Sequence, residues 1–90
     1  MLNIDIFKPA ERFLRKLQQK QQKQITRKIL SIANNPTPSD SKLLKGFLGC
    51  YRTDVGEYRI IYKFSSIVLY VLLIGKRNDD EVYRKFKRLL

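Results

Sequence analysis

The first part of the chain shows one strand pattern followed by two helical patterns. Residues 2–7 alternate apolar and polar side chains with the period of a half-buried strand. Pro9 then stands at a natural first position of a helix, and apolar residues recur at helical spacing as far as Leu17. A second stripe of helical period covers residues 20–33, until the sequence NNPTPSD ends it. The pattern therefore predicts a strand and then two helices.

Beyond Asp40 the hydrophobic period changes to that of strands. The segments CYRTDV, YRIIYKF and IVLYVLLI are rich in β-branched and aromatic residues. They are separated by Gly56-Glu57 and by Ser65-Ser66, two-residue connections of the kind that close hairpins. The spacing predicts a three-stranded antiparallel meander. Its last strand is apolar on both sides, so we expect it at the centre of the sheet, with strand 2–7 as a candidate neighbour.

The middle strand of the meander, residues 58–64, has two different faces. Its side chains alternate between an apolar set and a set that carries charge: Tyr58, Ile60, Tyr62 and Phe64 against Arg59, Ile61 and Lys63. We expect the first set in the core. The second set predicts a charge-bearing face on the other side of the sheet.

The C-terminal segment has the features of a short helix. Asp79 and Asp80 offer an N-cap and favourable charge in the first turn. The apolar stripe consists of Val82, Phe86 and Leu89 or Leu90. The predicted order is βααβββα, an α+β fold in which an antiparallel sheet packs on an N-terminal helical hairpin and a short C-terminal helix follows. Ninety residues leave room for one core, so we expect residues 1–90 to form a single domain.

The charge of the chain points to a polyanionic partner. Nineteen Lys and Arg against eight Asp and Glu leave a net charge of +11. Such an excess destabilises the compact state by self-repulsion unless nucleic acid or an acidic protein is the intended partner. From Lys8 to Lys28 there are eight basic residues and one acidic residue. The outer face of the helical hairpin is therefore either a solvated surface or one that faces phosphates.

The missing residue types exclude several kinds of chemistry. With no His and one Cys, the chain builds no zinc site, no Ser/His/Asp or Cys/His triad and no internal disulfide. Any reaction must use Lys, Arg, Tyr, Asp or Glu, and we expect neither a metal nor a cofactor. Without a His base, Cys50 is expected to be a small buried hydrophobe rather than a nucleophile.

Cysteine usage and hydropathy also bear on the compartment. A lone cysteine fits a reducing cytosol, so we expect a cytoplasmic protein. The longest apolar run, residues 67–74, has eight residues, whereas a membrane-spanning helix needs about twenty. We expect no membrane segment and no secretory leader.

Charged side chains gather where the predicted strands meet. Period-two alternation puts Arg52 and Asp54 on one face of their strand, and Arg59 lies across a two-residue turn. The basic pair Lys76 and Arg77 follows the third strand of the meander. We expect these side chains to converge. The guanidinium fork donates to two oxygens at once, so the arginines suit a phosphate group.

Each of these residues also has a simpler interpretation. Salt bridges of Asp54 and Glu57 with Arg52 and Arg59 would explain the same charges on an exposed sheet, although the cations outnumber the anions. Tyr83 lies next to the apolar stripe of the terminal helix, where it is either a packing residue or a stacking platform for an unstacked RNA base.

Three segments resemble a known family. KLLKG at 42–46, CYRTDVGEYRIIY at 50–62 and GKRNDDEVYRKFKRLL at 75–90 resemble the RelE toxins of bacterial toxin-antitoxin systems, which share the RelE/ParE superfamily fold. The resemblance implies an mRNA interferase, an endoribonuclease that enters the A site of the 70S ribosome. It implies cleavage of mRNA by attack of the ribose 2'-hydroxyl on the adjacent phosphate, without a metal. A small acidic antitoxin is the expected protein partner.

The resemblance also implies roles for individual residues. Arg59 would stabilise charge on the scissile phosphate, and Arg77 would protonate or stabilise the departing 5'-oxygen. Tyr83 would stack on the mRNA base, and Arg52 would hold phosphate. Further RNA contacts are expected at Lys45, Lys76 and Arg84.

Asp54 departs from the family pattern. RelE has a Lys at this position, thought to be the general base, and the turn that follows is shorter here. Neighbouring arginines favour the ionised form of Asp54, which makes its carboxylate a weak proton acceptor near neutral pH. The identity of the base is therefore open.

Two other functions compete with cleavage of mRNA. A ParE-like inhibitor of DNA gyrase would use the same fold without the combination of Arg77 and Tyr83. A non-catalytic basic domain that only binds RNA is the third hypothesis, and Asp54 is the best evidence for it.

Overall fold

The computed structural model describes residues 1–77, 84 and 86–88. Its elements are β1 (Asn3–Ile6), α1 (Lys8–Arg15), α2 (Gln19–Asn34), β2 (Lys42–Leu43), β3 (Tyr51–Val55), β4 (Tyr58–Phe64) and β5 (Val68–Lys76). Residues 84 and 86–88 are helical. The predicted α+β fold is confirmed, with β2 as an addition. A strand of two residues is too short to produce a periodic pattern.

The strands form one mixed sheet in the order β1-β5-β4-β3-β2. Strands β3, β4 and β5 are an antiparallel meander, as predicted. Strand β5 lies between β4 and β1, so the strand that is apolar on both sides is an interior strand with β1 as its neighbour, as expected, although β4 is the middle one of the five. Strand β1 runs parallel to β5, with Asn3 opposite Val68, so the sheet is not wholly antiparallel. Hydrophobic periodicity does not encode the direction of a neighbouring strand.

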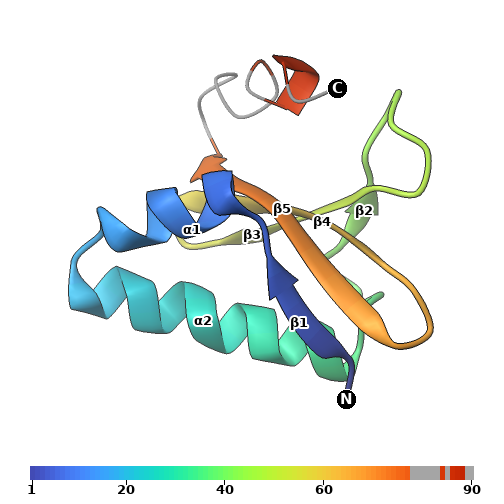
Figure 1. Ribbon diagram of the computed structural model, residues 1–90, viewed down its shortest axis with the longest axis horizontal. Coiled ribbons are helices and arrows are strands. Elements are labelled where there is room, and N and C mark those ends of the chain that lie inside the picture. Colours follow the sequence, from blue (N-terminus) through green and yellow to red (C-terminus); the bar gives the residue numbers. More distant parts are fainter. Residues whose placement is uncertain (78–83, 85, 89–90) are drawn as a thin grey trace.

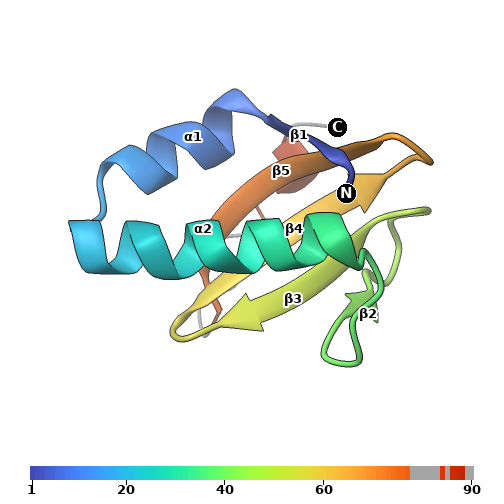
Figure 2. The ribbon, with the colours of Figure 1, turned by 90° about the horizontal axis from the view of Figure 1, so that it is seen from below.

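Helices α1 and α2 cover one face of the sheet (Figures 1 and 2). Pro stands in the first turn of α1, as its fixed φ allows. The apolar stripe of α2 faces the strands and builds the main core. The fully buried residues of this main core include Ile25, Ile32, Ile60, Tyr62, Leu69, Val71 and Ile74. No helix among residues 1–77, 84 and 86–88 is long and apolar enough to cross a membrane.

The opposite face of the sheet carries a second apolar cluster. It consists of Leu44, Cys50, Ile61, Leu72, Leu73 and Phe86. The face predicted to carry charge through Arg59 and Lys63 is thus also partly apolar around Ile61, because the loop before β3 and the C-terminal segment cover this part of the sheet. The buried Cys50 fits its predicted packing role, and burial raises the pKa of its thiol.

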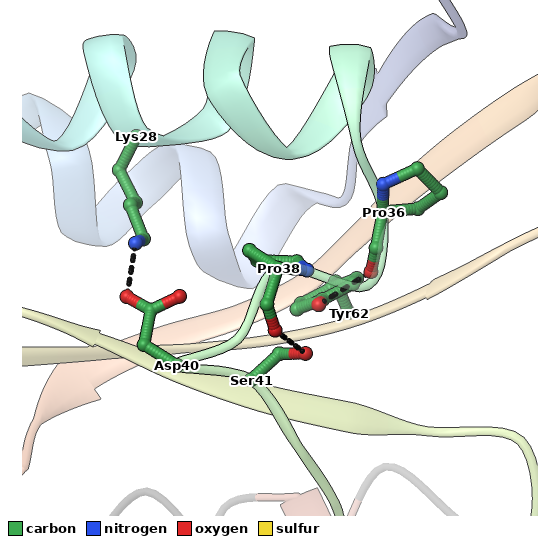
Figure 3. A network of polar contacts seen from close by, with 6 residues as sticks. All are labelled: Lys28, Pro36, Pro38, Asp40, Ser41 and Tyr62. Carbon is green, nitrogen blue, oxygen red and sulfur yellow. Dashed lines mark hydrogen bonds and ion pairs between the residues drawn. The ribbon is translucent and has the colours of Figure 1, made fainter.

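A tether joins the loop at 35–41 to the sheet (Figure 3). The hydroxyl of the buried Tyr62 donates a hydrogen bond of 2.8 Å to the carbonyl oxygen of Pro36. The ammonium group of Lys28, on α2, pairs with the carboxylate of Asp40. The hydrogen bond from Lys28 is the main reason why the pKa of Asp40 is lowered. The contacts hold α2 and its following loop against β4.

Candidate active site

The β3–β4 hairpin sets the geometry of the site. Its register places Asp54 directly opposite Arg59, across the two-residue turn Gly56-Glu57. Gly56 has a φ of +56°, and no non-glycine residue in the described part of the chain has a positive φ. A positive φ at the first central position alone is the pattern of a type II' turn, which suits the twist of a hairpin. The turn therefore fixes Asp54 and Arg59 as direct neighbours on opposite strands of the hairpin.

Asp54 and Arg59 form a two-point ion pair. Nε of Arg59 lies 2.7 Å from Oδ1 of Asp54, and Nη2 lies 3.2 Å from Oδ2. The side chain of Arg59 is 15% exposed and that of Asp54 is 34% exposed. The hydrogen bond from Arg59 is the largest cause of a lowered pKa of Asp54, and it outweighs the opposing effect of burial. The simpler salt-bridge interpretation is thus realised for this pair.

Two further arginines lie around the same carboxylate. Arg52 is two residues before Asp54 on the same face of β3, and the backbone N–H of Arg77 donates to the carbonyl oxygen of Glu57 at 2.9 Å. The positive charges of Arg52 and Arg77 both lower the pKa of Asp54. We call Arg52, Arg59 and Arg77 around Asp54 the arginine cluster. Of the side chains expected to converge, Arg59 contacts Asp54 directly, and Arg52 and Arg77 act on it through their charge, so cations exceed anions in this group.

The other predicted site residues lie apart from the arginine cluster or outside the described residues. Lys76 pairs with Tyr58, whose side chain is in the main core, so strand alternation assigns Lys76 to the helix-covered side. The expected convergence of Lys76 with the arginines is therefore not found. Lys45 is exposed in the loop between β2 and β3, and Arg84 is exposed. Tyr83 lies outside the described residues.

The structure adds one cation that the sequence pattern did not single out. Lys42, on β2, pairs with Arg52 and shares its face of the sheet. It is exposed at the edge strand. Its segment KLLKG was part of the family resemblance, but a two-residue strand gave no signal that would place Lys42 beside Arg52.

The second apolar cluster adjoins the arginine cluster. Arg59 and Ile61 point to the same side of β4, and Ile61 packs in a cluster with Leu73 and Phe86. Figure 1 shows the described C-terminal residues on the side of the sheet away from α2. Burial of Phe86 therefore fixes this part of the chain on the face that carries Arg59.

The chemistry available at this face is cationic. Arginine stays protonated at neutral pH, so the cluster donates hydrogen bonds and stabilises negative charge but does not accept protons. Among the residues that the structure describes, no three His, Cys, Asp or Glu side chains are grouped to hold a metal ion. Such an arrangement fits recognition of a phosphate group.

Comparison with known proteins identifies the family. Residues 4–81 match the family of ParE toxins of type II toxin-antitoxin systems, parDE. The chain belongs to the RelE/ParE toxin family. The mRNA interferase toxin RelE of Escherichia coli (strain K12) is 29% identical over 92 residues, which cover 97% of this chain and 96% of that protein. The resemblance inferred from the three segments is thus confirmed.

Solved structures of RelE toxins share the fold. The crystal structure of the isolated E. coli RelE toxin matches 100% of both chains with a TM-score of 0.74 and 26% identity. The toxin in the crystal structure of the intact E. coli RelBE toxin-antitoxin complex matches 84% of this chain and 96% of its own, with a TM-score of 0.74 and 25% identity. The described residues of this family member therefore have a RelE-like architecture.

Proposed function

We propose that this RelE/ParE family member is an mRNA interferase, a ribosome-dependent endoribonuclease that inhibits translation. The observation that carries the proposal is the arginine cluster. Arg59 binds one carboxylate directly and the charges of Arg52 and Arg77 act on the same carboxylate, in a chain that is similar over its length to the mRNA interferase toxin RelE. A phosphodiester of single-stranded RNA is the substrate group that suits this surplus of bidentate donors.

The reaction would be a transfer within the RNA. The 2'-oxygen of the ribose forms a bond to the adjacent phosphorus while the bond from phosphorus to the 5'-oxygen breaks. Negative charge grows on the phosphate oxygens and on the departing 5'-oxygen, which preorganised donors stabilise. We assign the phosphate oxygens to Arg59 with Arg52, and the departing oxygen to Arg77. Tyr83 is proposed to stack on the neighbouring base.

The arginine cluster offers no strong acceptor for the 2'-hydroxyl proton. Asp54 is the carboxylate of the cluster, but its pKa is lowered and its oxygens accept hydrogen bonds from Arg59. Both features weaken it as a base. We therefore propose that Asp54 does not replace the family Lys as an efficient general base.

A gel of translated mRNA tests the function directly. Radiolabelled mRNA is translated in a bacterial extract with and without the protein, and an Arg59→Ala, Arg77→Ala double variant serves as the control. We expect discrete cleavage products with the native protein only. Intact mRNA under conditions in which the protein is shown to occupy ribosomes would contradict the proposal.

Inhibition of DNA gyrase is a second candidate, because the matching family is that of ParE toxins. A supercoiling assay with purified gyrase separates the two functions. The interferase proposal expects unchanged supercoiling and cleaved mRNA. Inhibited supercoiling with intact mRNA would assign the chain to the gyrase-inhibiting branch.

A small acidic antitoxin is the proposed cytoplasmic partner. Relatives have been crystallised with the RelB antitoxin, including those of E. coli and Pyrococcus horikoshii. This chain carries a charge of +11. It also has a largely apolar groove of about 390 Å³ beside the second apolar cluster. Its lining includes Phe7, Leu48, Leu72 and Phe86, with Lys63 as the cation. An acidic amphipathic segment fits such a surface.

A further inference from the structure

The contact between Asp54 and Arg59 mimics the contact that a phosphate would make. Two oxygens of one carboxylate accept hydrogen bonds from Nε and Nη2, which lie along one edge of the guanidinium. A phosphodiester presents two oxygens to the same edge with the same two-point geometry. One edge cannot donate its hydrogen bonds to both groups in full. Carboxylate and phosphate therefore compete for Arg59.

We propose that Asp54 is an internal competitor of RNA phosphate, which engages Arg59 along this edge only when it displaces the carboxylate. The inference rests on the proposed function, since it takes the bound anion to be an RNA phosphodiester. Asp54 thereby limits how much Arg59 contributes to the affinity for RNA. This assigns a role to the residue that departs from the family Lys.

The exposures of the two side chains indicate which partner moves. Arg59 is 15% exposed, whereas Asp54 is 34% exposed and is flanked by the charges of Arg52 and Arg77. A displaced carboxylate thus turns toward water and toward two other cations, while Arg59 keeps its less exposed position. An arriving phosphate meets Arg52 and Arg77 and then exchanges with the carboxylate.

Competition removes the affinity that Arg59 would otherwise add to the bound substrate. The phosphodiester of the ground state carries one negative charge, as the carboxylate does, so exchange at Arg59 brings little affinity. The phosphorane-like transition state carries more negative charge on the same oxygens, and it outcompetes the carboxylate. An interaction that strengthens only in the transition state raises the rate constant rather than the affinity.

A binding experiment with a matched charge control tests the competition. The probe is a single-stranded 2'-O-methyl oligoribonucleotide, which lacks the attacking hydroxyl and stays intact. Asp54→Asn and Glu57→Gln each remove one negative charge near the same turn, but only Asp54→Asn removes the competitor of Arg59. We expect Asp54→Asn to bind the probe several-fold more tightly than the native protein. Glu57→Gln should change the affinity by less than about two-fold.

Salt dependence provides a second readout of the same variants. Each phosphate contact to a single strand contributes about 0.7 to the slope of log K against log salt concentration. We expect Asp54→Asn to steepen that slope by about one such contact, and Glu57→Gln to leave it unchanged. Circular dichroism checks that each variant is folded. If Asp54→Asn does not fold, the same measurements are made with Asp54→Ser.

A double-mutant cycle completes the test. Arg59→Ala should cost little affinity in the native background but several-fold in the Asp54→Asn background. Additive effects, or equal effects of Asp54→Asn and Glu57→Gln, would overturn the inference. Cleavage of translated mRNA with an additive cycle would refute only the role of Asp54. Coupling of Arg59 with Asp54 in a protein that cleaves no mRNA would refute only the interferase function.

Discussion

Arg59 and Arg77 are expected to act on the rate of the reaction more than on binding. The guanidinium of Arg59 is held in place before substrate arrives by its ion pair with Asp54, and the backbone of Arg77 is anchored to Glu57. Loss of one preorganised donor commonly costs roughly 10²- to 10³-fold in rate. We expect that loss in single-turnover cleavage for Arg59→Ala and for Arg77→Ala, with ribosome affinity almost unchanged.

The control for these variants is Arg15→Ala. Arg15 pairs with Glu11 on the exposed side of α1, so its replacement removes the same charge away from the cluster. Its cleavage rate should stay near that of the native protein. Equal losses of binding and cleavage in Arg59→Ala or Arg77→Ala would show that these arginines provide affinity alone.

Asp54 gives a separate prediction for cleavage. Its folded-state pKa is lowered, so the ionised pair with Arg59 stabilises the protein at neutral pH and is lost as the pH falls through that lowered value. A group that stays ionised between pH 5 and 8 adds no step to the pH–rate profile there.

We expect Asp54→Asn to be nearly neutral in single-turnover cleavage on programmed ribosomes, and Asp54→Lys to be neutral or faster. A collapse of cleavage in Asp54→Asn with intact ribosome affinity would instead identify Asp54 as the base.

At the scale of elements, the β3–β4 turn determines the alignment of the cluster. Gly56 has a φ of +56°, and a Cβ atom there would lie 2.9 Å from Nε2 of Gln24 on α2. A left-handed φ costs a non-glycine residue roughly 1–3 kcal/mol. We expect Gly56→Ala to lower the free energy of unfolding in urea by an amount in that range.

Two companion variants separate the causes of this loss. Glu57→Ala, at the neighbouring position without a positive φ, should change stability far less. Gly56→Ala combined with Gln24→Ala removes the close contact but leaves the backbone strain. We expect this double variant to recover only part of the free energy of unfolding that Gly56→Ala loses. Unchanged stability of Gly56→Ala would show that the turn adopts another conformation at little cost.

The periodic signals in the sequence predicted most elements and one face of the site. A period of two put Arg52, Asp54 and Arg59 together, because strand alternation and the turn length are local properties. Long stripes likewise predicted α2 and the central position of β5. Signals that depend on distant pairing were missed: β2 is two residues long, and nothing local shows that Phe86 covers Ile61. The side of the sheet on which Lys76 lies follows from its pairing with Tyr58, which only the structure supplies.

At the scale of the whole molecule, the charge of +11 predicts the character of the antitoxin. We expect the product of the adjacent gene to be small and acidic, and to restore growth when it is co-expressed with the toxin. Its apolar segment would occupy the groove lined by Phe7 and Phe86, or displace the C-terminal segment that carries Tyr83. Continued toxicity in cells where the partner is shown to be bound would contradict this mechanism of inhibition.

The parallel pairing of β1 with β5 has a consequence for biosynthesis. Asn3 pairs with Val68, so β1 has no neighbour in the sheet until residues 68–76 have also left the ribosome. Contacts this distant in sequence form late, because the intervening loop must close first. A nascent chain that stops before Val68 also lacks β5, one of the two partner strands of β4. If the protein cleaves mRNA as proposed, breaks in its own message upstream of codon 68 would yield only inert fragments, and the toxin would limit its own synthesis.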